Sequence, residues 1–211
     1  MRMTVSKNSG SCLLCKQDIE HRYMVRHLNK CLEKTATVEA SEKEKIYRFK
    51  ISDGKLFWLY IEINASSSLE ELDSFLRETW LECCGHMSEF RINGEGYSSD
   101  GEMGKRIHRL FDTGTEFDYD YDFGSTTTLE GKVISIRPGK LKKEIRLLAR
   151  NHLPDLQCSM CEEDPILICS ICYDFFCKKC KKKHDDCDGE SAMLPVVNSP
   201  RMGVCGYCGP E

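Results

Sequence analysis

The chain has 211 residues, which is enough for one ordinary domain with appendages or for two small domains. Hydrophobic residues make up 40% and charged residues 30% of it, which excludes a disordered or fibrous chain. The formal net charge of −4 excludes a general polyanion binder but leaves room for local basic faces.

The fourteen cysteines are concentrated at the two ends of the chain, with only Cys83 and Cys84 between residues 32 and 157. No apolar segment follows the first charged residues, so we expect no signal peptide and a cytoplasmic location, where cysteines favour metal over disulfides. The longest apolar run, 56–61, is far shorter than the roughly 20 residues of a membrane-spanning helix. We predict three parts: a Cys-Cys-His-Cys zinc finger at 1–36, an α+β domain at 43–150 and a cysteine-rich zinc module at 154–211.

The first part contains four metal-ligand residues at finger spacing, Cys12-x2-Cys15-x11-His27-x3-Cys31. A C-x2-C pair offers two thiolates from one turn, and a helix would place His27 and Cys31 on one face. Four nitrogen and sulfur donors suit a tetrahedral structural zinc ion.

This segment, Cys12-Leu13-Leu14-Cys15 with His27-Leu28-Asn29-Lys30-Cys31, resembles the ubiquitin-binding zinc fingers of DNA-repair adaptors. The resemblance implies a small ββα-like finger. That family carries an acidic residue, which contacts ubiquitin, where this chain has Asn29. The basic residues Arg22, Arg26 and Lys30 instead follow one another at spacings of four, which suits a phosphate or acidic partner, or simply a solvated face.

The central part predicts mostly strands. Alternating residues at 46–51, a turn at 52–55 and an aromatic, β-branched run at 56–63 indicate a hairpin. An amphipathic helix follows at 69–80. Further strands are expected at 89–92, 116–123, 129–137 and 142–150, with a Gly/Ser-rich loop at 93–104. The fold class is therefore α+β, a central antiparallel sheet with one main helix between two zinc modules.

This order of elements, together with Tyr121-Asp122-Phe123-Gly124, resembles the root-inducing-plasmid open-reading-frame-three-like family over residues 43–150. The resemblance implies an α+β domain of unassigned function, of a kind common in bacteria and archaea. Cys83 and Cys84 are expected to be core thiols, and His86 an isolated histidine.

Three carboxylates, Asp118, Asp120 and Asp122, alternate with aromatic residues, so a strand would place them on one face. They could hold Mg²⁺ in a nuclease or phosphotransferase. The simpler interpretation is an amphipathic strand with buried rings and solvated acids, because no other catalytic group stands nearby in the sequence. We therefore expect no catalytic residues.

The third part reads C-x2-C-x7-C-x2-C-x4-C-x2-C-x3-H-x2-C, eight donors that match two tetrahedral zinc sites. It resembles type-one B-box and related cross-brace fingers. The resemblance implies one zinc ion on Cys158, Cys161, Cys177 and Cys180, and another on Cys169, Cys172, His184 and Cys187. A further knuckle, Cys205 and Cys208, either stays free or displaces an upstream pair, so we expect about three zinc ions per chain.

The zinc-bearing ends and the segment before residue 150 are basic, which favours a zinc protein that binds RNA or a ribonucleoprotein such as the ribosome. A protein–protein adaptor is the alternative. The candidate nucleic-acid residues are Arg22, Arg26, Lys30, Lys142, Lys143, Arg146, Lys178, Lys179, Lys181 and Lys182.

Overall fold

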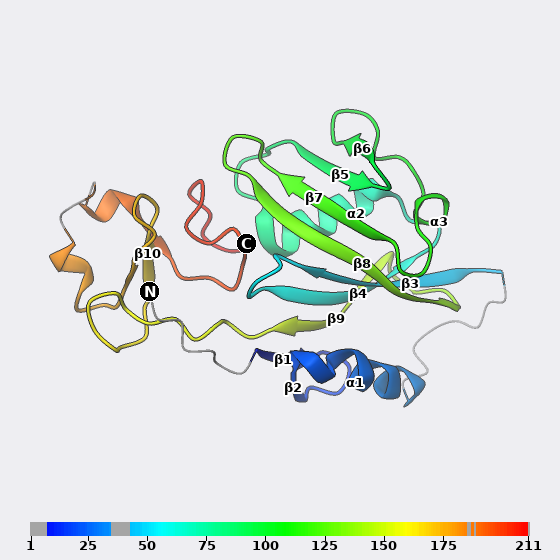
Figure 1. Cartoon of the computed structure of the whole chain (residues 1–211), viewed down its shortest axis with the longest axis horizontal. Helices are drawn as coiled ribbons and strands as arrows, with labels where there is room; N and C mark the ends of the chain where they lie inside the picture. Colours follow the sequence, from blue (N-terminus) through cyan, green and yellow to red (C-terminus); the bar gives the residue numbers. More distant parts are fainter. Residues whose placement is uncertain (1–7, 35–42, 185–186, 188, 211) are drawn as a thin grey trace.

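A computed structural model describes residues 8–34, 43–184, 187 and 189–210. Within these residues, nine strands form one antiparallel sheet in the order β2-β1-β9-β4-β3-β8-β7-β5-β6. Their bounds are β1 Ser9–Cys12, β2 Asp18–Glu20, β3 Lys45–Ser52, β4 Trp58–Asn64, β5 Ser88–Ile92, β6 Glu95–Ser98, β7 Glu116–Tyr121, β8 Thr127–Pro138 and β9 Ile145–Asn151. The chain is thus α+β with a mostly antiparallel architecture (Figure 1).

The centre of the sheet is the hairpin β3–β4. The carboxylate of Asp53 accepts hydrogen bonds from the backbone N–H groups of residues 55, 56 and 57, at 2.9 to 3.0 Å, and so fixes the turn. Gly54 takes a positive φ of 74°, which this turn requires. The turn sets the register, in which Ile51 faces Leu59.

One face of the sheet packs against helix α2 (Leu69–Leu76), which continues as a short wider turn at Arg77–Leu81. Ser68 caps the helix in a reciprocal capping box with Glu71, a local signal for its start. Leu72 and Leu76 join Phe49 and Ile61 in the main hydrophobic core. A one-turn helix, α3 (Ile107–Leu110), closes the same core.

The opposite face is covered by helix α1 (His21–Lys34). Met24 and Leu28 of α1 pack on Trp58, Tyr60 and Leu148 in a second core. The strands before α1 extend the sheet, because β1 pairs with β9.

The contact between β1 and β9 needs a glycine at Gly10. A β-carbon at Gly10 would lie 2.1 Å from the carbonyl oxygen of Arg150. The N-terminal segment is therefore packed into the sheet.

A second, small sheet holds β11 (Phe175–Phe176), β10 (Leu167–Cys169) and β12 (Met193–Pro195), and lies beside the main sheet (Figure 1). Two tight helical turns, Lys181–Lys183 and Gly189–Ala192, complete this C-terminal module. After β12 the chain returns to the main sheet. Ser199 Oγ donates to the carbonyl oxygen of Trp80 at 2.6 Å, and Arg201 is fully buried.

Some element boundaries differ from those expected. The predicted helix at 69–80 has its regular part only to Leu76, and the predicted Gly/Ser-rich loop contains strand β6. Of the helices that the structure describes, none is long and apolar enough to cross a membrane.

Candidate metal centres

Four groups of cysteine and histidine side chains lie within the described parts of the chain, each with its four ligand atoms less than 4.8 Å apart. They consist of Cys12, Cys15, His27 and Cys31; Cys158, Cys161, Cys177 and Cys180; Cys169, Cys172, His184 and Cys187; and Cys83, Cys84, His86 and Cys205. Each group could hold one metal ion.

The N-terminal centre is built from a knuckle and a helix. Cys12 ends β1, and Lys16 in a left-handed conformation turns the chain so that its N–H donates to the Cys12 carbonyl at 2.7 Å. His27 and Cys31 lie one turn apart on α1. The Cys12 and Cys31 sulfur atoms are 3.9 Å apart, and Cys15 Sγ lies 3.3 Å from His27 Nε2.

The C-terminal module holds two centres in alternation along the chain, so that the first and third ligand pairs meet, as do the second and fourth. Cys161 Sγ lies 3.7 Å from the sulfur atoms of both Cys177 and Cys180. In the other centre, Cys172 Sγ lies 3.8 Å from His184 Nε2. The imidazole of His184 packs against the ring of Phe176, with centroids 4.5 Å apart.

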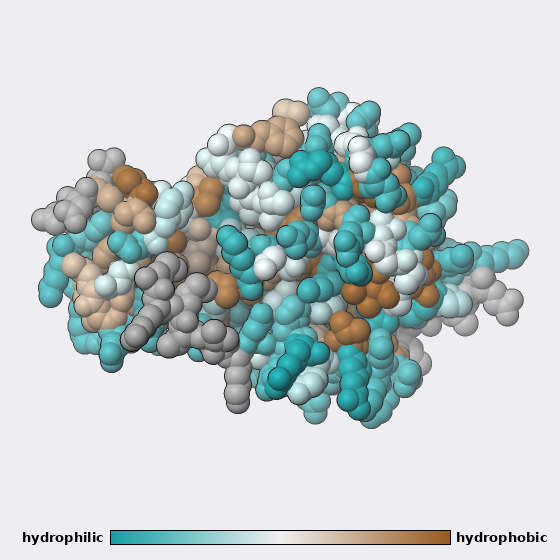
Figure 2. All heavy atoms as spheres, viewed as in Figure 1, coloured by the Kyte–Doolittle hydropathy of each residue, from teal (hydrophilic) through white to brown (hydrophobic). Residues whose placement is uncertain are grey.

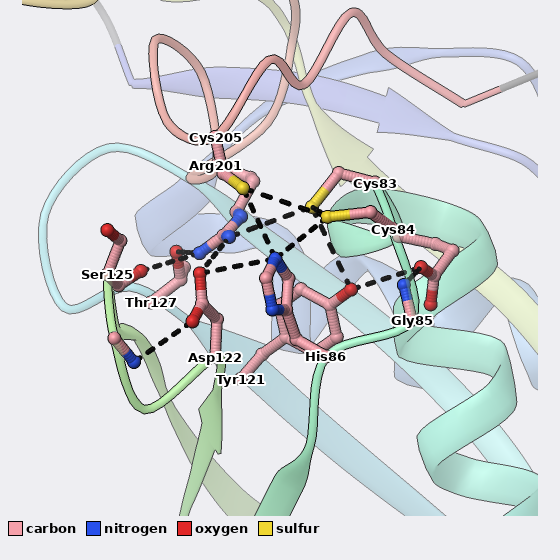
Figure 3. Close-up of polar contacts among 12 residues, drawn as sticks. Cys83, Cys84, Gly85, His86, Tyr121, Asp122, Ser125, Thr127, Arg201 and Cys205 are labelled. Carbon is pink, nitrogen blue, oxygen red and sulfur yellow. Dashed lines mark hydrogen bonds and ion pairs between the residues drawn. The ribbon is translucent and has the colours of Figure 1, made fainter.

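The fourth group joins residues far apart in sequence and corrects two expectations. Cys84 is not a core thiol, since it is exposed, whereas Cys83 is half-buried and packs against the main hydrophobic core. His86 is not isolated, because its Nε2 lies 2.9 Å from Cys84 Sγ and 3.2 Å from Cys205 Sγ (Figure 3). The described residues thus offer four candidate groups, whereas the sequence spacing predicted sites for about three zinc ions.

The two cysteines of the C-terminal C-x2-C pair, Cys205 and Cys208, do not contact the same group in the structure. Cys205 meets Cys84, sulfur to sulfur, at 3.8 Å. Cys208 is exposed, and its thiol donates to the carbonyl oxygen of Gly206. Sequence spacing could not reveal this arrangement, because Cys205 lies 119 residues beyond His86. The only local signal was an unassigned histidine two residues after a cysteine pair.

The sulfur–sulfur distances fit a shared cation. They lie between 3.7 and 3.9 Å, whereas a disulfide bond is about 2.05 Å long. Sulfur atoms bound to one zinc ion at about 2.3 Å in a tetrahedron are about 3.8 Å apart. The thiols are therefore placed as ligands of a common ion would be.

The pKa values of the thiols indicate that a divalent cation would stabilise several thiolates in one group. Burial opposes ionisation of Cys169 but backbone N–H groups outweigh it, lowering its pKa to about 6; the same balance lowers the pKa of Cys158 to about 7. Burial and neighbouring thiols raise the pKa of Cys31 and of Cys180 to about 12. One thiolate forms readily and then disfavours the next, and a bound divalent cation would remove that repulsion.

The acidic strand does not form a metal site. Asp120 binds Arg91 at 2.5 Å and Thr128 at 2.6 Å. Asp122 lies beyond the end of β7, has a φ of 64° and pairs with the buried Arg201. Asp118 is half-exposed and lies 4.0 Å from Arg91. Within the described residues the three carboxylates do not converge, while the intervening rings are buried in the core.

Comparison with solved structures finds a distant structural neighbour. No protein-family model matches the sequence, and no curated protein matches it. A solved structure of a protein of unknown function, MM3350 from Methanosarcina mazei Go1, aligns with 20% identity and a TM-score of 0.42. The alignment covers 50% of this chain and 67% of that chain. The family and finger types suggested by the sequence remain predictions.

Proposed function

We propose that this chain is a non-enzymatic zinc protein that binds RNA, free or in a ribonucleoprotein such as the ribosome, through the exposed basic face of α1. Thiolate and imidazole donors suit zinc better than they suit magnesium, calcium or manganese. The observation that carries the RNA proposal is an exposed aromatic ring among basic side chains on the outer face of the N-terminal finger.

Tyr23 is the centre of this α1 face. Its side chain is 49% exposed although it is a large ring, and the guanidinium of Arg22 lies 4.7 Å from the ring centroid. Arg26 and Lys30 follow at helical spacing and are exposed. Together with Tyr23, and with Asp18 and Glu20 of β2 on the other side, they line a shallow open groove. The surface here is mostly hydrophilic (Figure 2).

This combination suits single-stranded nucleic acid. An exposed ring stacks on a base of any identity, and cations spaced along a helix contact successive phosphates. Among the described residues, no ion pair involves Arg26 or Lys30, so both cations are available to a ligand.

The other basic candidates divide into two sets. Arg146 pairs with the buried Glu62, which also binds Arg137 at 2.8 Å, so Arg146 serves the fold. Lys179 pairs with Glu163 at 2.5 Å on the C-terminal module, where Lys181 also lies. The exposed lysines that can extend the footprint are Lys142, Lys143, Lys178 and Lys182.

A protein partner is the second candidate, and it is favoured by the C-terminal module. Four large apolar side chains, Met160, Ile166, Ile171 and Tyr173, are each 48 to 56% exposed. Brown and tan side chains gather at that end of the molecule (Figure 2). In the N-terminal finger, by contrast, Asn29 accepts a hydrogen bond from Arg48 of the sheet at 2.6 Å, so the position that contacts ubiquitin in the resembling fingers is used internally.

The test is RNA binding by the zinc-loaded full chain over a range of salt concentrations. The double variant Arg26→Ala/Lys30→Ala should bind at least tenfold more weakly and reduce the slope of log affinity against log salt by about 1 to 2. Tyr23→Ala should weaken binding about tenfold with the slope unchanged. Lys55→Ala, an exposed lysine in the β3–β4 turn, is the matched control and should bind as the wild type does.

Absence of salt-dependent RNA binding by the wild type would contradict the RNA proposal. If Lys55→Ala weakened RNA binding as much as the α1 variants do, the assignment of the α1 face as the RNA-binding surface would be wrong. A pull-down that survives nuclease and is lost on Met160→Ser/Ile171→Ser would support the protein partner instead.

A further inference from the structure

We propose that Cys83, Cys84, His86 and Cys205 bind a fourth zinc ion, forming a composite site that holds the C-terminal tail on the main sheet and releases its ion first. This inference is independent of RNA binding. It concerns a donor set that local sequence spacing does not contain.

Two separate segments build the composite site. The chain leaves the helical turn at Leu81, and Gly85, with a φ of 75°, reverses its direction. The N–H of Gly85 donates to Glu82 Oε1 at 2.6 Å, which fixes the reversal. His86 is thereby directed back toward the two preceding cysteines, and the tail brings Cys205 to the same point (Figure 3).

The geometry matches that of the three other centres. Cys83 and Cys84 sulfur atoms are 3.7 Å apart, and Cys84 and Cys205 sulfur atoms 3.8 Å, against about 3.8 Å for a tetrahedral zinc–thiolate edge. The His86 Nε2 atom points at the sulfur atoms, and its ring is held edge-on to Tyr121, centroids 5.7 Å apart. Three sulfur donors and one nitrogen donor complete four-coordination without a further ligand.

The residues around the site support a charged centre. A zinc ion with three thiolates and a neutral imidazole carries one net negative charge, which a nearby cation stabilises. Arg201 Nη2 lies 3.7 Å from Cys83 Sγ and 2.5 Å from Asp122 Oδ2, and this carboxylate oxygen also lies 3.5 Å from His86 Nε2. Its other terminal nitrogen donates to the Ser125 carbonyl at 2.6 Å, so the fully buried guanidinium is fixed in place.

The same residues explain what the ion would do. Arg201 and Cys205 belong to the tail. Asp122 lies in the β7–β8 turn, and the other three ligands lie in the connection between the α2 helix end and β5. A zinc ion here would cross-link segments about 120 residues apart and reinforce the tail contacts. Because the C-terminal module is joined to the sheet by its two ends, holding the tail also restricts the module.

Solvent exposure distinguishes this site from the others. Each other centre has at least one buried cysteine, namely Cys12, Cys158 or Cys169. In the composite site none of the four ligands is buried, and Cys84 and Cys205 are exposed. Competing chelators therefore reach this ion most easily.

The test counts zinc in the full chain purified with zinc, by native mass spectrometry and elemental analysis. The wild type should hold four ions, Cys205→Ser three and Cys208→Ser four, the last as a matched control three residues away. Cys205→His restores a nitrogen donor and should return the count to four. Three ions in the wild type, or four in Cys205→Ser, would overturn the proposal.

Release kinetics supply the second readout. With the zinc-binding dye 4-(2-pyridylazo)resorcinol in excess, the wild type and Cys208→Ser should release one ion in a fast phase and three slowly. The fast phase should be absent from Cys205→Ser, whose retained slow phase shows that the other centres are intact. A fast phase that persists in Cys205→Ser would contradict the assignment of the labile ion.

Discussion

His21, the first residue of α1, stacks its imidazole on the indole of Trp58, with ring centroids 4.4 Å apart and planes 6° apart. Burial, with a contribution from Lys50, lowers the pKa of His21 to about 4, from about 6.5 in an unfolded chain. Between about pH 4 and pH 6.5 the imidazole of His21 is protonated in the unfolded chain but neutral in the folded chain. The contribution of His21 to the free energy of unfolding is therefore fully present above about pH 6.5 and is lost as the pH is lowered toward 4.

The variant His21→Phe keeps a stacked ring without a titrating group. Between pH 7 and pH 5, the urea midpoint of the wild type should fall more than that of His21→Phe, because acid release of metal affects both chains and cancels in the comparison. The measurement is urea unfolding followed by tryptophan fluorescence at each pH. Parallel decline of the two midpoints would show that burial of His21 does not contribute to the acid sensitivity.

At the scale of residues, sequence spacing predicted ligand groups whose members are close in sequence but not the group whose members are far apart. The knuckle and helix spacing of Cys12, Cys15, His27 and Cys31 is visible within twenty residues, and the structure brings those side chains together. The group containing His86 and Cys205 depends on the path of the whole chain. The buried ion pairs could not be predicted either, since nothing near Glu62 in the sequence shows that it binds Arg137 and Arg146.

At the scale of elements, strand β8 depends on a glycine beneath an aromatic ring. A β-carbon at Gly131 would lie 2.0 Å from Cζ of Phe117 on the neighbouring strand β7. Phe117 in turn packs on Phe49, Phe90 and Phe111 in the core, so it has little room to move. Gly131→Ala should therefore displace a core ring.

We expect Gly131→Ala to lower the free energy of unfolding by about 1 to 3 kcal/mol, the usual cost of overpacking a core. Thermal or urea unfolding measures this directly. Gly104→Ala is the matched control, because a β-carbon added at Gly104 would have no atom within 4 Å and the φ of this residue is not positive. If Gly131→Ala lowered the free energy of unfolding no more than Gly104→Ala does, the Phe117 ring could move aside without a loss of stability.

The main elements followed from periodicity and turn chemistry, and the exceptions have identifiable causes. The β3–β4 hairpin was predictable because alternation and a D-G turn agree over residues 46–63. Strand β6 was missed because Gly96 and the serines around it resemble a loop, and it is stabilised by pairing with β5. Helix α3 spans a single turn and has no periodicity to detect.

At the scale of the whole molecule, the three predicted parts are joined physically. β1 of the N-terminal segment pairs with β9 of the central sheet, and the tail at 196–208 returns to the sheet after the C-terminal module. Such contacts do not alter local composition, so the distribution of cysteines in the sequence indicated three parts but could not show the packing between them. The fold therefore positions all four Cys/His groups, two of them with ligands on elements that contact the main sheet.

Each of these four groups is expected to hold one zinc ion, and anomalous diffraction from crystals of the zinc-loaded full chain would locate these ions. Data collected just above and below the zinc absorption edge should give four peaks, one within each group, each about 2.3 Å from its sulfur ligands. The fourth peak should lie between His86 and Cys205, away from Cys208. Three peaks, or a peak bound by Cys208 in place of Cys205, would show that the four proposed zinc sites are wrongly assigned.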